Sequence, residues 1–171
     1  MAIDELETIV SRLDGYIDAL SSIGSDAQRN TAGARKVTLD TNNIDESINA
    51  LFTGYCKGFQ EDFPDMAVST FSFQKSISIT NWIRVLHNEL EKYLLPKDYE
   101  NSIATPEALK SIKYYLAWQV MEMVRMISSD FESEIIFKSH YVTSDSRIGV
   151  LFLIPVGDAC LTLRFDSVAD V

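Results

Sequence analysis

Hydrophobic residues recur every three or four positions in four stretches of the chain, with polar residues between them. This spacing places apolar side chains on one face of a helix. It predicts helices over about 3–23, 44–58, 82–94 and 106–128. Thr105 can cap the last of these, and Pro106 at the first helical position sacrifices no hydrogen bond. We expect this longest helix to be the central one.

Alternation of apolar and polar residues predicts strands elsewhere. It occurs within 71–79, where Lys75 interrupts the apolar face and indicates an edge or a break. Three further strands, joined by turns, are predicted over 133–142, 148–156 and 160–168. The second of these is apolar without alternation and should be covered on both faces. The third alternates and should show one face to water.

Residues 24–43 contain glycine, serine, threonine and asparagine but almost no large apolar residue, which predicts a long, mobile loop. No internal repeat, linker or shift of composition divides the chain, so we expect residues 1–171 to form a single globular domain. The predicted fold class is α+β. It comprises N-terminal helices with one intervening strand, a long central helix and a C-terminal three-stranded antiparallel meander.

The chain is strongly acidic. Twenty-five Asp and Glu residues against fifteen Lys and Arg residues give a formal net charge of −10, and the isoelectric point is about 4.6. Such a charge repels the phosphates of nucleic acids and argues against direct binding of DNA or RNA. It would steer a basic protein toward the chain. The alternative is that the acidity serves only solubility.

Several features favour a cytoplasmic protein. Residues 1–7 are acidic, unlike the basic start of a secretory signal. The longest apolar stretch, 148–157, is too short for a membrane-spanning helix and contains proline and glycine. Cys56 and Cys160 stand alone, without metal-binding or redox spacing, as expected in a reducing compartment. We expect no contact with a membrane, and the sequence does not indicate the oligomeric state.

Residues suited to catalysis are few. The motifs of metal sites and phosphate-binding loops are absent from the sequence, so we expect neither a metal ion nor a cofactor. Cys160 and His140 could form a nucleophile and base across the meander, with Asp145 or Asp158 orienting the imidazole. A cysteine in an apolar strand is more often part of the core. We therefore expect no enzymatic activity.

Acidic residues are concentrated toward the N-terminus. Residues 1–65 hold twelve acids and five bases, whereas 66–171 hold thirteen and ten. Around the second predicted helix the acids are interleaved with aromatic residues. Charges set the rate of encounter and buried aromatics carry most of the affinity, so this pattern favours a surface for a basic protein over an ordinary solvated helix face. The predicted partner-binding residues are Asp45, Glu46, Tyr55, Phe59, Glu61, Asp62 and Asp65.

The general layout and the closing segments 134–137, 150–155 and 161–165 resemble those of bacterial immunity proteins, which belong to contact-dependent inhibition or type VI secretion systems. The resemblance implies an inhibitor that binds a cognate basic toxin, such as a nuclease, and masks its active cleft. One alternative is an acidic secretion chaperone or adaptor, which should dimerise and bind an unfolded segment. The other is an enzyme with an unrecognised site, which should hold polar groups in a pocket.

Overall fold

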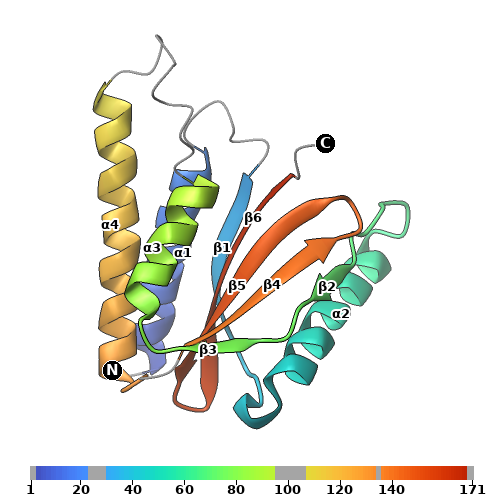
Figure 1. Ribbon diagram of the computed structural model, residues 1–171. Coiled ribbons are helices and arrows are strands. Elements are labelled where there is room, and N and C mark those ends of the chain that lie inside the picture. The colour runs from blue at the N-terminus through green and yellow to red at the C-terminus, as the bar shows by residue number, and fades with distance from the viewer. Residues whose placement is uncertain (1–2, 23–29, 95–106, 134–135, 169–171) are drawn as a thin grey trace.

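The computed structural model describes residues 3–22, 30–94, 107–133 and 136–168, which form helices and strands in the arrangement of Figure 1. The helices are α1 (Ile3–Ser22), α2 (Ile44–Asp62), α3 (Trp82–Leu94) and α4 (Glu107–Asp130), with a 3-10 turn at Thr41–Asn43 before α2. The strands are β1 (Asn30–Val37), β2 (Phe71–Phe73), β3 (Ile77–Ile79), β4 (Ile136–Thr143), β5 (Arg147–Val156) and β6 (Ala159–Val168).

The six strands form one antiparallel sheet in the order β1-β6-β5-β4-β2. Both β2 and β3 pair with β4, β2 with its residues 141–143 and β3 with its residues 136–138. The three C-terminal strands are the predicted meander, and the α+β class is confirmed. The predicted break at Lys75 is also confirmed, because residues 74–76 separate β2 from β3. The helix predicted to end near Gly58 continues to Asp62.

Helices cover both faces of the sheet (Figure 1). Against one face, α1, α3 and α4 enclose the larger core, with side chains such as Leu13, Leu90 and Val124 packed on the sheet residues Phe152 and Phe165. Among the described helices, α2 alone lies against the other face, where it encloses a smaller core.

The predicted loop over 24–43 is wrong in its centre, because residues 30–37 form the edge strand β1. Residues 24–29 lie outside the described residues. The apolar pattern does not predict this strand, because its residues on the α1 side are small. Ala34 is buried there. The carboxylate of Asp14 in α1 accepts a hydrogen bond of 2.7 Å from the Ala34 amide, so the helix satisfies part of the free strand edge.

The expectation that the last strand shows one face to water is also wrong. β6 is an interior strand, paired with β1 on one side and β5 on the other. Its polar residues Thr162 and Asp166 are buried. These polar residues face the α2 side of the sheet, whereas the apolar residues between them face the larger core. The charge of Asp166 is balanced there by two arginines rather than by water. β5 is buried on both faces from residue 149 to 154, as predicted.

Candidate functional site

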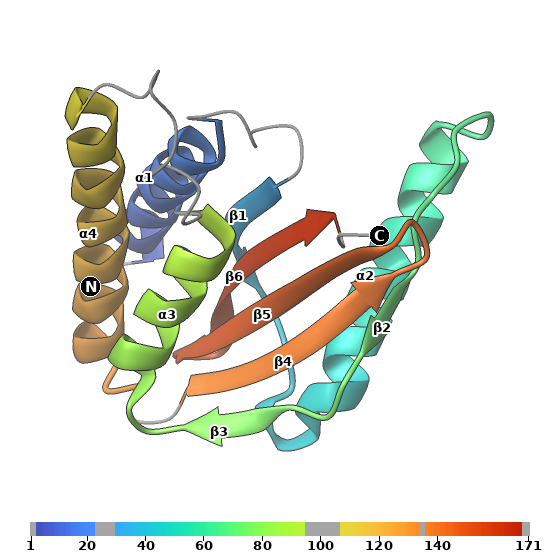
Figure 2. The ribbon, with the colours of Figure 1, turned by 45° about the horizontal axis from the view of Figure 1, so that its top comes forward.

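The C-terminal half of α2 projects beyond the strands (Figure 2). In the first half of the helix, the buried Phe52 packs its ring 4.8 Å from that of Phe71 and 4.9 Å from that of Phe73. Tyr55 and Phe59 continue the same helical stripe by one and two turns, but both side chains are exposed. The apolar face of α2 is therefore longer than the sheet that covers it.

The residues beyond Phe52 form an exposed aromatic cluster. Tyr55, Phe59, Phe63 and Met66 are between 40% and 53% exposed. The rings of Phe59 and Phe63 lie 4.9 Å apart, so these side chains already pack together without a partner. Soluble monomers seldom expose apolar residues in contiguous clusters, which makes this one a candidate for protein contact.

Three acidic residues follow or interleave with this cluster in the sequence. Glu61, Asp62 and Asp65 are all exposed. Glu61 lies 3.8 Å from Lys57, but both side chains are largely in water, where such a pair contributes little. We call the aromatic cluster and these three acids together the α2 tip. It contains five of the seven predicted partner-binding residues.

The other two predicted residues, Asp45 and Glu46, lie at the opposite end of α2. The rise of a helix puts them about 25 Å from Asp62. The Asp45 carboxylate accepts a hydrogen bond of 2.9 Å from the Ser76 amide. The Ser76 hydroxyl and amide lower the pKa of Asp45. Glu46 accepts a 2.6 Å hydrogen bond from the Asn43 side chain. Both acids anchor the start of the helix, so the single patch predicted from sequence is split.

A groove of about 1020 Å³ runs between the inner side of α2 and the sheet. Gly33 and Arg35 of β1 and Thr162 and Arg164 of β6 lie on its sheet side. Its other walls include Asp14 and Asp18 of α1 and Tyr55, Phe59 and Asp62 of α2. The groove therefore adjoins the α2 tip, and Tyr55, Phe59 and Asp62 belong to both.

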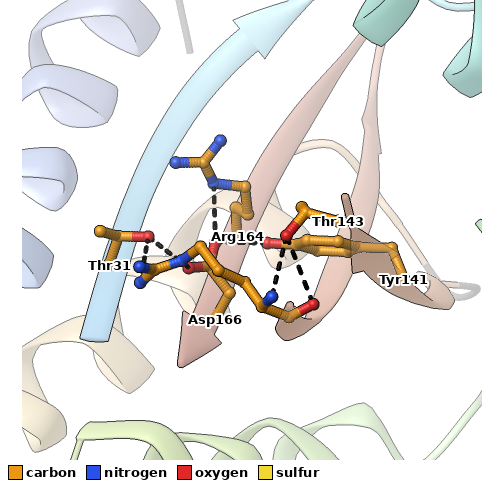
Figure 3. A network of polar contacts seen from close by, with 6 residues as sticks. Thr31, Tyr141, Thr143, Arg164 and Asp166 are labelled. Carbon is orange, nitrogen blue, oxygen red and sulfur yellow. Dashed lines mark hydrogen bonds and ion pairs between the residues drawn. The ribbon is translucent and has the colours of Figure 1, made fainter. Parts of the chain in front are cut away.

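A buried polar network lies on the same face of the sheet (Figure 3). Thr31, Asp166, Gly149 and Tyr141 are opposite one another in a row across β1, β6, β5 and β4. The Tyr141 hydroxyl donates a 2.6 Å hydrogen bond to Asp166. Burial and the Asp166 charge raise the pKa of Tyr141.

Arginines complete this network around Asp166. The Arg147 Nε donates to one carboxylate oxygen at 2.5 Å, and the Arg164 Nε lies 3.5 Å from the other. The Asp166 side chain is 3% exposed. A carboxylate this buried is stable in its charged form only when it is paired and hydrogen-bonded. Sequence reasoning missed the network, although an Asp and an Arg on alternate positions of an apolar strand were its visible signal.

A second buried pair lies on the opposite face, between α3 and β4. Lys138 Nζ donates a 2.5 Å hydrogen bond to Glu89 Oε1, and within the described residues no hydrogen bond reaches Glu89 Oε2. His140 follows Lys138 on the same face of β4. Burial, followed by the charge of Lys138, lowers the pKa of His140. These groups hold α3 against the sheet and lie apart from the groove.

The structure does not bring His140 and Cys160 together. His140 is opposite Val150, which belongs to the larger core, whereas Cys160 belongs to the core beneath α2. The two side chains therefore lie on opposite faces of the sheet. Burial raises the pKa of Cys160 to about 11, which disfavours the thiolate needed for nucleophilic attack. A Cys160–His140 catalytic pair is excluded by this geometry.

Neither a metal site nor a membrane-spanning helix is present among the described residues. No three His, Cys, Asp or Glu side chains in the described ranges converge as metal ligands would. None of the helices, as far as they are described, is both long and apolar enough to cross a membrane.

Comparison with known proteins gave distant structural matches. No family model and no curated protein matches the chain. Two crystal structures of citrus MAF1 are similar to it at TM-scores of 0.36 and 0.39, with 8% and 10% sequence identity. These matches cover 95% and 94% of this chain and 99% of the citrus chains. A likeness this distant assigns no family.

Proposed function

We propose that this protein is a binding protein without catalytic activity, and that its α2 tip docks onto a basic protein. The observation that carries the proposal is the exposed aromatic cluster of Tyr55, Phe59 and Phe63, together with the exposed Met66. Large aromatic side chains at the centre of an interface supply most of its binding energy once they are desolvated. In the free protein their exposure is unfavourable, so a partner that covers them stabilises both molecules.

The acidic residues of the α2 tip identify the charge of the partner. Glu61, Asp62 and Asp65 are exposed beside the aromatic residues in the sequence, and the whole chain carries a net charge of −10. A basic surface would approach these acids faster and in a preferred orientation. A neutral or acidic partner would gain nothing from them.

A basic toxin is the partner that we propose, as the resemblance to bacterial immunity proteins implies. In this mechanism the α2 tip covers the basic, substrate-binding cleft of the toxin and blocks it by bulk and by charge. The mechanism requires no reaction on this chain.

The test uses the basic proteins encoded beside this chain's gene as probes. Each is produced alone and together with this chain, growth is measured, and binding is measured by calorimetry. We expect one probe to stop growth alone and to be neutralised on co-production. A Tyr55→Ala/Phe59→Ala variant should bind it at least about 100-fold more weakly, because each centrally buried aromatic contributes about 2 kcal/mol or more.

The control is a Tyr115→Ala/Trp118→Ala variant, which removes two aromatics of α4 that are even more exposed than Tyr55 and Phe59. It should bind and neutralise as the wild type does. The proposal is wrong if no basic neighbour binds, or if the variant at Tyr55 and Phe59 retains full affinity.

A secretion chaperone or adaptor is the second candidate, and the outer face of α4 favours it. Ile112, Tyr115 and Trp118 are exposed there, and the rings of Tyr115 and Trp118 lie 6.4 Å apart. Such a chaperone should form a stable dimer. Light scattering of the purified protein separates the two candidates, because a monomer is expected for docking through the α2 tip alone and a dimer for the chaperone.

A further inference from the structure

Two arginines, Arg35 and Arg164, line the groove, and within the described ranges no ion pair reaches their terminal guanidinium nitrogens. Arg35 is exposed, and within the described residues no carboxylate forms an ion pair with it. Arg164 contacts Asp166 through Nε alone, at 3.5 Å. Figure 3 shows the terminal nitrogens of Arg164 directed away from Asp166. The chain has ten more acids than bases, yet within the described residues Arg35 has no acidic partner and Arg164 uses only its Nε.

The pairing of β1 with β6 places these arginines close together. Arg35 is opposite Thr162, and Arg164 is opposite Gly33, so the two arginines are diagonal neighbours on one face of the sheet. Such neighbours have their Cβ atoms about 7–8 Å apart or somewhat less. Two arginine side chains at this spacing can reach one oxyanion between them.

Aromatic rings and a carboxylate position both guanidinium groups. The Arg35 guanidinium lies 5.9 Å from the centre of the Tyr55 ring, and that of Arg164 lies 6.0 Å from the centre of the Phe71 ring. Asp166 holds Arg164 by its Nε, which leaves the terminal N–H groups for another acceptor. Side chains fixed in this way lose less entropy when they bind.

Gly33 keeps the space beside them open. It lies between Thr31 and Arg35 on the groove side of β1, directly opposite Arg164. A Cβ atom at this position would come within 3.3 Å of the Asp14 carboxylate. Any larger residue would therefore both crowd α1 and fill the floor of the groove between the two guanidinium groups.

We propose that this groove binds the carboxylate of a ligand between Arg35 and Arg164. Arginine donates paired N–H groups in a fork that matches a carboxylate. The apolar part of the ligand would lie against Tyr55 and Phe59, which line the same groove. Its volume of about 1020 Å³ is that of a small-molecule site.

The acids of the groove restrict the charge of the ligand. Asp14, Asp18 and Asp62 line it as well, and Asp14 is already engaged by the Ala34 amide. Their field disfavours a multiply charged anion such as a phosphate ester. A monocarboxylate with an apolar or aromatic part fits best. It would be either a free organic acid or the carboxyl end of a peptide.

The experiment follows backbone amide and arginine Nε–H resonances of the isolated protein during titration. Benzoate represents a free acid and N-acetylphenylalanine represents a peptide end, and the amide of each serves as its neutral control. We expect saturable shifts at Gly33, Gly54 and Arg164 for the acids, with at least a tenfold weaker response to the amides. The tighter of the two acids identifies the source of the carboxylate.

Variants test the two arginines separately. Arg35→Gln and Arg164→Gln should each weaken binding of the better acid at least tenfold, whereas Arg125→Gln on the outer face of α4 should not change it. Arg35 is exposed, so its variant remains informative if Arg164→Gln does not fold. The inference is overturned if the amides bind as well as the acids, if no probe saturates, or if Arg35→Gln binds as the wild type does. This titration contains no protein partner, so its failure leaves docking through the α2 tip untouched.

Discussion

The Tyr141 ring occupies the space that a side chain at Gly149 would fill. The two residues are opposite each other in β4 and β5, and Gly149 is in turn opposite Asp166 in β6. The ring can therefore cross a whole strand and donate its hydroxyl hydrogen to Asp166. Because Gly149 has no side chain, a hydrogen bond can form between β4 and β6, which are not neighbours in the sheet.

A Gly149→Ala substitution should consequently destabilise the protein by about 1–3 kcal/mol, the usual range for forcing an extra carbon into a packed site. The new Cβ would lie 2.7 Å from Cε1 of Tyr141. Urea unfolding measures the change. Gly54→Ala is the control, because nothing lies within 4 Å of its added Cβ and alanine is the better helix former. Equal stability of Gly149→Ala and the wild type would contradict the crowded geometry.

Removing the charge of Asp166 should cost more. An Asp166→Asn substitution leaves Arg147 without its buried counter-ion, and breaking a buried pair typically costs about 3–5 kcal/mol. The exposed pair of Glu122 and Arg125 gives the comparison, since Glu122→Gln should change the free energy of unfolding by less than about 1 kcal/mol. Thermal unfolding of both variants measures the two losses of stability. If the two losses were similar, Asp166 would not be the centre of the network.

Alkaline pH should destabilise the protein, because the buried Tyr93 must lose its proton. Burial, and then the charge of Glu89, raises the pKa of Tyr93 from 10.0 to about 12. Between these values the unfolded chain releases a proton that the folded chain retains, so stability is complete below pH 10 and falls as the pH rises toward 12. Urea unfolding at a series of pH values measures the fall. A Tyr93→Phe variant should show a shallower decline, and an identical decline would contradict this origin.

The two cysteines should differ in reactivity. Cys160 is buried with its pKa raised to about 11, whereas Cys56 is only half-buried. Because the thiolate is the reactive form, an aromatic disulfide reagent should modify Cys56 first and Cys160 only upon unfolding. Absorbance of the released thiol gives the two rates. A Cys56→Ser variant should lose the fast phase, and its persistence would place Cys160 nearer the surface than the structure does.

The sequence predicted the elements whose side chains follow one strong period. Leu13, Leu86 and Val124 lie on stripes with helical spacing, and all three are buried in the larger core as expected. The C-terminal meander was equally clear, since β5 is apolar on both faces. Local patterns suffice for such elements because their burial repeats along the chain.

β1 could not be predicted from the sequence, and the exposure of β6 was predicted wrongly, because both depend on pairing between distant segments. Ala34 and Gly33 look like loop residues until α1 packs against them. Asp166 looks solvent-exposed until arginines and Tyr141 surround it. The predicted partner-binding patch is also split by the three-dimensional structure. Its seven predicted residues are close in sequence, but the length of α2 separates Asp45 and Glu46 from the rest.

Docking through the α2 tip is tested most directly by the rate of association with the basic partner at low and at physiological salt. For the wild type, the rate constant should fall steeply as salt is added. A Glu61→Gln/Asp62→Asn/Asp65→Asn variant should associate about tenfold more slowly at low salt, with little change in the dissociation rate. An association rate that ignores both salt and these three substitutions would contradict the account.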